Sequence, residues 1–369
     1  MSTDSPFPEL KKTHTMSRIG RPWRDIKPPP SAPVWAVVQG FASYWALVAA
    51  IDLGVFDAVE RLGSADSATL AEELGVSALH LRHMCDVLVT LDFLDQIHGE
   101  YELTETAERY LCTNGAASMA TLIRVAPGPH GNWEQLVETV RNGAVTHPIE
   151  RDPVAFYLPL VEATFVTQYR AATRLGMRLG WRRQPALRVL DIGAGLAPWA
   201  IALLEQSVGS SAMINDLEGV LARTREVIEE RGLSDRVAFA PGDFHDIDVG
   251  TDAFDVVVLG HVCRAEGEHG ATSLVAKAMR ALRPGGTLLL ADYFADGDRK
   301  YNTFGVQMGL TMVANTLLGG ALTTDQVVGW LRVAGFRSIR LLEPIGFTFV
   351  YVATKPTNPS TQLYEGTHR

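Results

Sequence analysis

The chain contains 369 residues, of which 47% are hydrophobic, 20% charged and 8% aromatic. At roughly 150 residues per domain this length predicts two or three domains, and the composition excludes both a miniprotein and a largely disordered chain. The 33 Lys and Arg residues against 42 Asp and Glu residues give a net charge of −9, which repels a phosphate backbone, so no nucleic-acid partner is expected.

The first 30 residues are expected to form a flexible arm. They mix acidic and basic side chains and contain no apolar segment of the kind that a signal peptide needs. The cysteines are far apart in the sequence, at spacings that indicate neither a disulfide framework nor a zinc site. They are Cys85, Cys112 and Cys263. A reducing, cytoplasmic location is therefore expected.

Residues 28–51 carry no charged side chain and include Trp35 and Trp45. Small polar breaks such as Gln39 and Ser43 interrupt the stretch, so we expect no membrane span. A helix that is buried in the protein or lies at a subunit interface explains both features. Because a soluble chain seldom exposes so much apolar surface, this stretch predicts a homodimer.

The region up to residue 103 has the pattern of a winged helix-turn-helix. One helix is expected over residues 34–60, a short capped helix over residues 67–75, and a third helix from Ser77 onward. A hairpin around Gly99 completes the pattern.

The winged-helix pattern fits a DNA-binding regulator or a module for dimerisation or substrate capping. A DNA-reading helix usually carries several basic and amide side chains, whereas the helix that begins at Ser77 offers one arginine, Arg82. The sequence therefore favours dimerisation or capping.

The C-terminal half has the pattern of an α/β fold. Residues 117–181 are expected to be helical with interruptions, and after residue 185 short strands alternate with helices, which indicates a parallel sheet covered on both faces. The expected parallel strands are residues 188–192, 212–215, 236–239, 254–259 and 286–292. Residues 338–342 and 346–353 are joined by a short turn and must be antiparallel neighbours. The fold class is thus α/β, a seven-stranded doubly wound, Rossmann-like sheet with one antiparallel edge strand, preceded by a mainly α-helical winged-helix domain.

The predicted domain organisation follows from these changes in pattern. The expected units are a flexible arm (1–30), a winged-helix dimerisation domain (31–116), a helical linker and substrate cap (117–182), a cofactor-binding domain (183–355) and a polar tail (356–369).

Glycines after the first predicted strand indicate a ligand-binding crevice. The strand ends in Asp191, and Gly193 and Gly195 let the backbone approach a ligand at the edge where doubly wound sheets bind. Asp216 ends the second strand, where an acidic side chain can bind both hydroxyls of a ribose. The third strand is followed by a carboxylate and an aromatic ring suited to an adenine, those of Asp243 and Phe244.

This series of motifs resembles the class I S-adenosylmethionine-dependent methyltransferases over residues 186–355. With the winged-helix region and a helix expected over residues 301–316, the chain resembles the small-molecule O-methyltransferases of the plant-type caffeate and acetylserotonin group and their bacterial natural-product branch. The resemblance implies an S-adenosylmethionine cofactor, a small-molecule acceptor and a homodimer with interlocking N-terminal domains. The cofactor contacts that it implies are Asp191, Gly193 and Gly195, then Asp216 with Leu217 at the ribose, and Asp243 with Phe244 at the adenine.

The chain departs from this family where the acceptor loses its proton. The family usually has an Asn-x-x-His segment after the fourth strand, whose histidine acts as the base, and here Arg264 takes its place. A guanidinium is protonated at any working pH, so it cannot remove a proton. A glutamate that the family often has beside that histidine is also missing, because residues 319–322 read Gly-Gly-Ala-Leu.

Three reactions remain compatible with this departure. The favoured one is O-methylation of an acceptor that is already acidic or that loses its proton to a displaced base, for which His261 and His130 are candidates. The second is C-methylation of an enol, a phenol ring or a 2-oxo acid, with Arg264 binding a carboxylate or stabilising an enolate. The third uses the cofactor as a fixed positive charge in a rearrangement or cyclisation.

Arg264 is expected to project into the acceptor pocket, and a surface ion pair with Glu266 or Glu268 is the simpler alternative. A metal site of His245, His261 and Glu266 is geometrically possible, but no tight ligand spacing supports it, so no metal is expected. The resemblance implies four residues in the acceptor pocket, Trp133, Met308, Met312 and Asn315.

Overall fold

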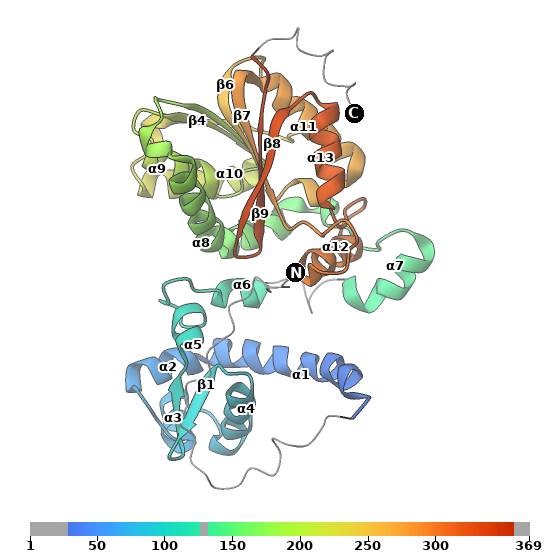
Figure 1. The fold of residues 1–369 in the computed structure, drawn as a ribbon. Coiled ribbons are helices and arrows are strands. Elements are labelled where there is room, and N and C mark those ends of the chain that lie inside the picture. Colours follow the sequence, from blue (N-terminus) through green and yellow to red (C-terminus); the bar gives the residue numbers. More distant parts are fainter. Residues whose placement is uncertain (1–28, 126–131, 358–369) are drawn as a thin grey trace, which may run out of the picture.

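The computed structural model describes residues 29–125 and 132–357. It shows a helical N-terminal part and an α/β C-terminal part, joined by helices that run between them (Figure 1). The fold class predicted from the sequence is confirmed.

The N-terminal part is a winged helix-turn-helix, as the sequence predicted. Its helices are α1 (Ala32–Leu53), α2 (Val55–Leu62), α3 (Ser67–Leu74) and α4 (Ala78–Thr90), and its hairpin is β1 (Leu94–Ile97) with β2 (Glu100–Leu103). The prediction of one helix over residues 34–60 is wrong, because Gly54 adopts a left-handed conformation with φ of 74° and separates α1 from α2.

Helix α1 is long and apolar enough to cross a membrane, by length and composition only. Its C-terminal turns are buried in the domain core at Val48, Ala50 and Ile51. Its N-terminal turns are exposed, with Trp35 at 57% and Phe41 at 69% exposure. The expectation that the helix is buried inside its own chain is therefore wrong for the N-terminal turns of α1, because no described element covers them. The alternative of a subunit interface stays a prediction.

Short helices connect the two parts. They are α5 (Glu105–Tyr110), α6 (Ala120–Val125) and α7 (Leu136–Asn142), and α8 (Pro153–Leu179) follows them. The hydroxyl of Tyr44 on α1 donates to the carbonyl of Ile123 on α6, at 2.9 Å. Helix α8 then runs 27 residues and packs along α9 (Pro198–Gln206), which brings the connecting region onto the C-terminal sheet.

The C-terminal sheet has seven strands in the order β5-β4-β3-β6-β7-β9-β8. The strands are β3 (Arg188–Ile192), β4 (Ser211–Asp216), β5 (Val237–Pro241), β6 (Phe254–Gly260), β7 (Leu282–Asp292), β8 (Arg337–Ile345) and β9 (Thr348–Thr354). Neighbours from β5 to β7 are parallel, and β9 is antiparallel to both β7 and β8. The predicted antiparallel strand exists, but it is not the edge strand, because the hairpin places β9 against β7 and leaves β8 outside.

Helices cover both faces of the sheet, and each face has its own apolar core (Figure 1). Helices α8, α9 (Pro198–Gln206) and α10 (Glu218–Glu230) pack on one face, and α11 (Gly267–Ala281) and α13 (Thr324–Val333) pack on the other. Helix α12 (Thr303–Asn315) lies outside these layers, beside the carboxyl ends of the strands. This arrangement leaves the carboxyl edge of β3, β4 and β6 as the place for a ligand.

Candidate active site

The turn after β3 has the backbone geometry that the sequence predicted. Gly193 and Gly195 have φ of 61° and 57°, a region that favours glycine. A Cβ atom at Gly193 would lie 2.5 Å from Cγ1 of Val262, so a side chain there would collide with the segment that follows β6. Helix α9 begins at Pro198, directly after this turn.

Two carboxylates lie at this turn. Asp216 accepts hydrogen bonds from the backbone N–H of Gly195 and of Leu217, both at 2.7 Å, which leaves lone pairs for other donors. Asp191 accepts from the N–H of Ala200, and its Oδ1 is buried without a partner among the described residues. Burial raises the pKa of both carboxyl groups, to about 7 for Asp191, and the charge of Asp216 adds to the effect at Asp191.

The loop after β5 brings Asp243 and Phe244 to the same edge. The ammonium of Lys277 on α11 donates to the carbonyls of Phe244, His245 and Ile247, which fixes the loop from outside the crevice. The ring of Phe244 would lie 3.5 Å from a Cβ atom at Gly193, so it borders the glycine turn. The structure thus brings the predicted adenine-side and ribose-side residues to one edge of the sheet.

Arg264 lies in a short helical turn after β6, and its side chain is buried rather than solvent-exposed. Its Nη1 donates to Oδ1 of Asp292 at 2.8 Å and to the carbonyl of His261 at 3.0 Å. Its Cζ lies 5.2 Å from the ring centroid of Tyr293. The prediction of a surface pair with Glu266 or Glu268 is therefore wrong. The turn after β6 brings the Arg264 side chain to Asp292, which ends the neighbouring parallel strand β7.

The Arg264–Asp292 ion pair keeps both groups charged. Burial opposes the charge on Asp292, but Arg264 and His261 outweigh it and hold the pKa of the carboxyl at about 2. Burial likewise opposes the charge on Arg264, and Asp292 outweighs it and holds the pKa of the guanidinium above its usual value. Nε of Arg264 and Oδ2 of Asp292 have no hydrogen-bond partner among the described residues.

His261 lies beside this pair, with its Nδ1 3.7 Å from Oδ1 of Asp292. Its ring packs against Trp199 and Tyr293, and neither ring nitrogen has a hydrogen-bond partner in the described part of the chain. Burial lowers the pKa of the imidazole although Asp292 opposes this, so the ring is neutral at neutral pH. A neutral imidazole at this place can accept a proton.

The predicted acceptor-pocket residues come together in part. The backbone N–H of Asn132, next to Trp133, donates to Oδ1 of Asn315 at 3.4 Å, which joins the capping segment to α12. Met312 and Asn315 are buried on α12, and Met308 is half-buried one turn earlier. The loop that follows α12 lies against Arg264, since the N–H of Gly320 donates to the Arg264 carbonyl. His130 lies outside the described residues.

The possible metal ligands are divided between two places. His245 Nε2 lies 2.7 Å from Glu266 Oε2 at the crevice rim, whereas His261 lies at Asp292. Among the described residues these side chains do not form one group of possible ligands. The group that does lie close enough together is in the N-terminal part and consists of Asp57, Glu60 and Cys112. The carboxylate of Asp57 is bound by the backbone and hydroxyl of Thr113.

The sequence reasoning missed Asp292 and Tyr157. Asp292 ends the strand next to β6, and a carboxylate at the carboxyl end of a neighbouring parallel strand is a signal that could have identified it. Tyr157 on α8 carries no motif, and its place depends on how the neighbouring Val154 and Val161 pack on Gly219 and Gly195.

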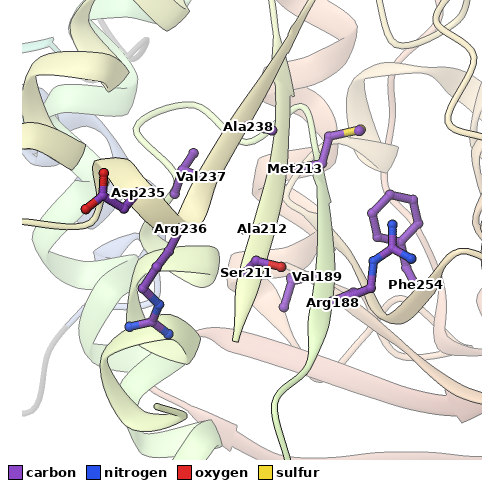
Figure 2. Close-up of a pocket in the computed structure, with 10 residues that line it drawn as sticks. All are labelled: Arg188, Val189, Ser211, Ala212, Met213, Asp235, Arg236, Val237, Ala238 and Phe254. Atoms are coloured by element: carbon purple, nitrogen blue, oxygen red, sulfur yellow. The ribbon is translucent and has the colours of Figure 1, made fainter. Parts of the chain in front are cut away.

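A cavity of about 260 Å³ lies at the opposite edge of the sheet, where β3, β4, β5 and β6 begin. Figure 2 shows the Arg188 guanidinium over the Phe254 ring, with Arg236 on the other side of the cavity. The Arg236 guanidinium is bound by three carbonyls that follow or end α9. Because doubly wound sheets bind ligands at the carboxyl ends of their strands, this cavity is not the candidate site.

Two family models match the chain. A model of the O-methyltransferase dimerisation domain matches residues 35–113, and a model of a methyltransferase domain matches residues 189–286. The first covers the winged helix together with most of α1, which associates this region with dimerisation rather than with DNA binding. The second runs from β3 through the glycine turn and Arg264 into β7.

Known proteins are similar to the chain over most of its length. The 3-hydroxy-5-methyl-1-naphthoate 3-O-methyltransferase of Streptomyces sahachiroi is 28% identical over 309 residues, covering 80% of this chain and 86% of that protein. Human N-acetylserotonin methyltransferase, solved in complex with SAM, has a TM-score of 0.76 and 21% identity, covering 90% of this chain and 99% of that one, which shows the fold. The aclacinomycin 10-hydroxylase RdmB of Streptomyces purpurascens is 33% identical over 149 residues, 40% of this chain and 39% of that protein.

Proposed function

The chain belongs to the O-methyltransferase family that carries a dimerisation domain, and we propose that it methylates an acceptor oxygen held by Arg264 without a protein base. It is an S-adenosylmethionine-dependent methyltransferase that acts on a small molecule of natural-product type. How the acceptor loses its proton depends on the residues at the ends of β6 and β7.

The crevice fits S-adenosylmethionine. The carboxylate of Asp216 is held by two backbone N–H groups and has lone pairs for the ribose hydroxyls, and the unpartnered Oδ1 of Asp191 can accept from an amine. Asp243 and Phe244 are proposed to contact the adenine, and Gly193 and Gly195 the methionine part, with the Phe244 ring next to Gly193. When bound, the cofactor supplies an electrophilic methyl group on a sulfonium.

Arg264 is proposed to bind the reacting oxygen of the acceptor. The observation that carries this is its buried ion pair with Asp292, which holds a permanent cation at the crevice and leaves Nε without a partner among the described residues. A guanidinium stabilises an oxygen anion and lowers the pKa of a hydroxyl that it contacts. Holding the oxygen close to the methyl group then supplies much of the rate enhancement, because methyl transfer is an in-line displacement.

A second way to handle the proton involves His261. The ring is neutral and next to Arg264, but it is enclosed by Trp199 and Tyr293. This makes Arg264 the better candidate for direct contact with the acceptor, and His261 the candidate base if the arginine proves dispensable.

A reaction without methyl transfer is the second candidate function. One similar protein is named a hydroxylase, which indicates that related chains also support other chemistry. This similarity favours a reaction without methyl transfer as the second candidate. C-methylation of an enol or 2-oxo acid stays a further alternative that Arg264 can serve. Transfer of a labelled methyl group to oxygen, to carbon or to neither distinguishes the three.

A cytoplasmic homodimer is proposed for the assembly. The exposed apolar side chains on α1, among them Trp35, Val38 and Phe41, lie in the segment that the dimerisation model matches. Burying them against a second copy removes apolar surface from water. Light scattering at the mass of a dimer supports this, and a monomer mass contradicts it.

The test of the proposed function uses labelled S-adenosylmethionine and a panel of hydroxyarenes that includes 3-hydroxy-5-methyl-1-naphthoate. Arg264→Ala should lose most turnover, by roughly 30-fold to 1,000-fold for the loss of a charge-assisted contact of about 2–4 kcal/mol. Arg264→Lys should keep part of the turnover, and the exposed Arg280→Ala is the matched control. Cofactor affinity should stay unchanged in all three. Full turnover of Arg264→Ala would move the role to His261 or His130.

A further inference from the structure

The first turns of α8 lie directly against Gly195 of the glycine turn and Gly219 in the first turn of α10. A Cβ atom at Gly195 would lie 2.8 Å from Cγ1 of Val161, and one at Gly219 would lie 2.7 Å from Cγ1 of Val154. Val154 and Val161 are seven residues apart, so they share one face of the helix. Tyr157 comes three residues after Val154 and four before Val161, and it therefore lies on the face that covers the crevice.

The hydroxyl of Tyr157 has no hydrogen-bond partner among the described residues, although the side chain is half-buried. The ring packs edge to face against Phe156, with centroids 5.2 Å apart. Burial raises the pKa of this hydroxyl to about 12, so it keeps its proton and stays a hydrogen-bond donor at working pH.

The charges that act on this hydroxyl come from both walls of the crevice. Arg264 lowers its pKa, and the carboxylates of Glu266, Glu150 and Asp216 raise it. The hydroxyl thus lies within electrostatic reach of the ribose-side carboxylate and of the arginine proposed to bind the acceptor. Glu266 is paired with His245 and Arg264 with Asp292, whereas Glu150 and Asp216 have no ion-pair partner among the described residues. These two carboxylates make the surroundings of the Tyr157 hydroxyl unfavourable for a second negative charge on the acceptor, beyond the one that Arg264 would stabilise.

We propose that Tyr157 binds the acceptor, its hydroxyl donating a hydrogen bond to a neutral carbonyl oxygen while the reacting hydroxyl lies toward Arg264. The acceptor class is then a hydroxyarene that carries a ketone or quinone oxygen, rather than a simple phenol or a hydroxybenzoate. This inference rests on the proposed function, because it assumes that a methyl acceptor enters the crevice.

The test measures the binding of three matched phenols to the full-length protein saturated with S-adenosylhomocysteine. The probes are 3-hydroxyacetophenone, 3-ethylphenol, which lacks the carbonyl oxygen, and 3-hydroxybenzoate, which carries a charge in its place. Ligand-observed NMR titration gives the dissociation constants. The wild-type protein should bind 3-hydroxyacetophenone about tenfold more tightly than either of the others, the effect of one hydrogen bond in a buried site.

Two conservative variants complete the test. The Tyr157→Phe variant should bind 3-hydroxyacetophenone and 3-ethylphenol about equally tightly. Tyr169→Phe is the control, because Tyr169 is on the same helix but its hydroxyl binds Glu205, and it should keep the preference. A wild-type protein without the preference, or a Tyr157→Phe variant that keeps it, would overturn the inference. Failure of the wild-type protein to bind S-adenosylhomocysteine would instead overturn the proposed function.

Discussion

The two halves of the candidate site are built in different ways. At the ends of β3, β4 and β5, backbone groups determine the geometry: positive φ at Gly193 and Gly195, and N–H groups that hold the Asp216 carboxylate. At the ends of β6 and β7, side chains determine it, through the ion pair of Arg264 with Asp292. We call these the cofactor half and the acceptor half.

This difference indicates which half of the site tolerates substitutions that would alter the reaction. A crevice made by glycine turns tolerates few substitutions, because a Cβ atom at Gly193 or Gly195 would collide with Val262 or Val161. An acceptor half made by a pair of side chains depends on Arg264 and Asp292 themselves, so substitutions there can alter its chemistry without moving the backbone. The cofactor can therefore stay the same while the acceptor and the handling of its proton differ.

The largest effect is expected from separating the buried pair of the acceptor half. Asp292→Asn leaves the Arg264 guanidinium buried without a counter-ion, which should lower the free energy of unfolding by about 3–5 kcal/mol. Urea denaturation measures this. Combining Asp292→Asn with Arg264→Met removes both charges and should recover much of the loss. Equal instability of the single and double variants would show that the pair does not hold the acceptor half together.

The next effect concerns the cofactor half alone. Asp216→Ala should weaken binding of S-adenosylmethionine by about 100-fold, because charge-assisted hydrogen bonds of roughly 1.5–3 kcal/mol each are lost. Isothermal titration measures the affinity. Glu218→Ala, which removes an exposed carboxylate two residues away, is the control and should bind normally. Unchanged binding by Asp216→Ala would remove this residue from the cofactor half.

The contact of α8 with the crevice predicts a smaller effect. Gly219→Ala forces a methyl group against Val154 and should lower the free energy of unfolding by about 1–3 kcal/mol. The loss should shrink when Val154→Ala makes room, as a double-mutant cycle of melting temperatures would show. Equal losses in both backgrounds would mean that α8 does not rest on this glycine.

The effect that is smallest per step, counted for each pH unit, is a pH dependence from the cofactor half. The pKa of Asp191 is raised from about 3.8 to about 7, so the folded protein binds its proton more tightly than the unfolded chain does. Stability without cofactor should therefore fall as the pH rises from about 4 to 7, by at most about 1.4 kcal/mol per pH unit from this group. Asp191→Asn should remove that slope in denaturation curves. An identical slope in the variant would contradict the raised pKa.

The sequence predicted most of the fold because its signals were local. Alternating strands and helices, the caps of α3 and the hairpin at Gly99 depend on neighbours in the chain. The break of α1 at Gly54 was missed because a glycine within an apolar helical run does not always end the helix. The position of β9 inside the sheet was missed because antiparallel pairing with β8 does not say which of the two strands meets β7.

The positions of the cofactor-half residues could be predicted for the same reason, since they end or follow consecutive strands of a parallel sheet. Their contacts with the cofactor stay a prediction. In the acceptor half the sequence indicated Arg264, but its ion-pair partner could not be predicted, because Asp292 is far from it in the sequence. The pairing of Arg264 with Asp292 needs the register of β6 on β7, and the place of Tyr157 needs the packing of α8 on two glycines. These are tertiary contacts without a sequence pattern.

The most direct test of the central claim is the pH dependence of kcat/KM for two acceptors whose hydroxyl pKa values differ by one unit or more. If Arg264 binds an oxygen that loses its proton without a protein base, the midpoint of the wild-type profile should move with the acceptor's own pKa. A midpoint that stays the same for both acceptors would show that a group on the protein removes the proton, and would contradict the account.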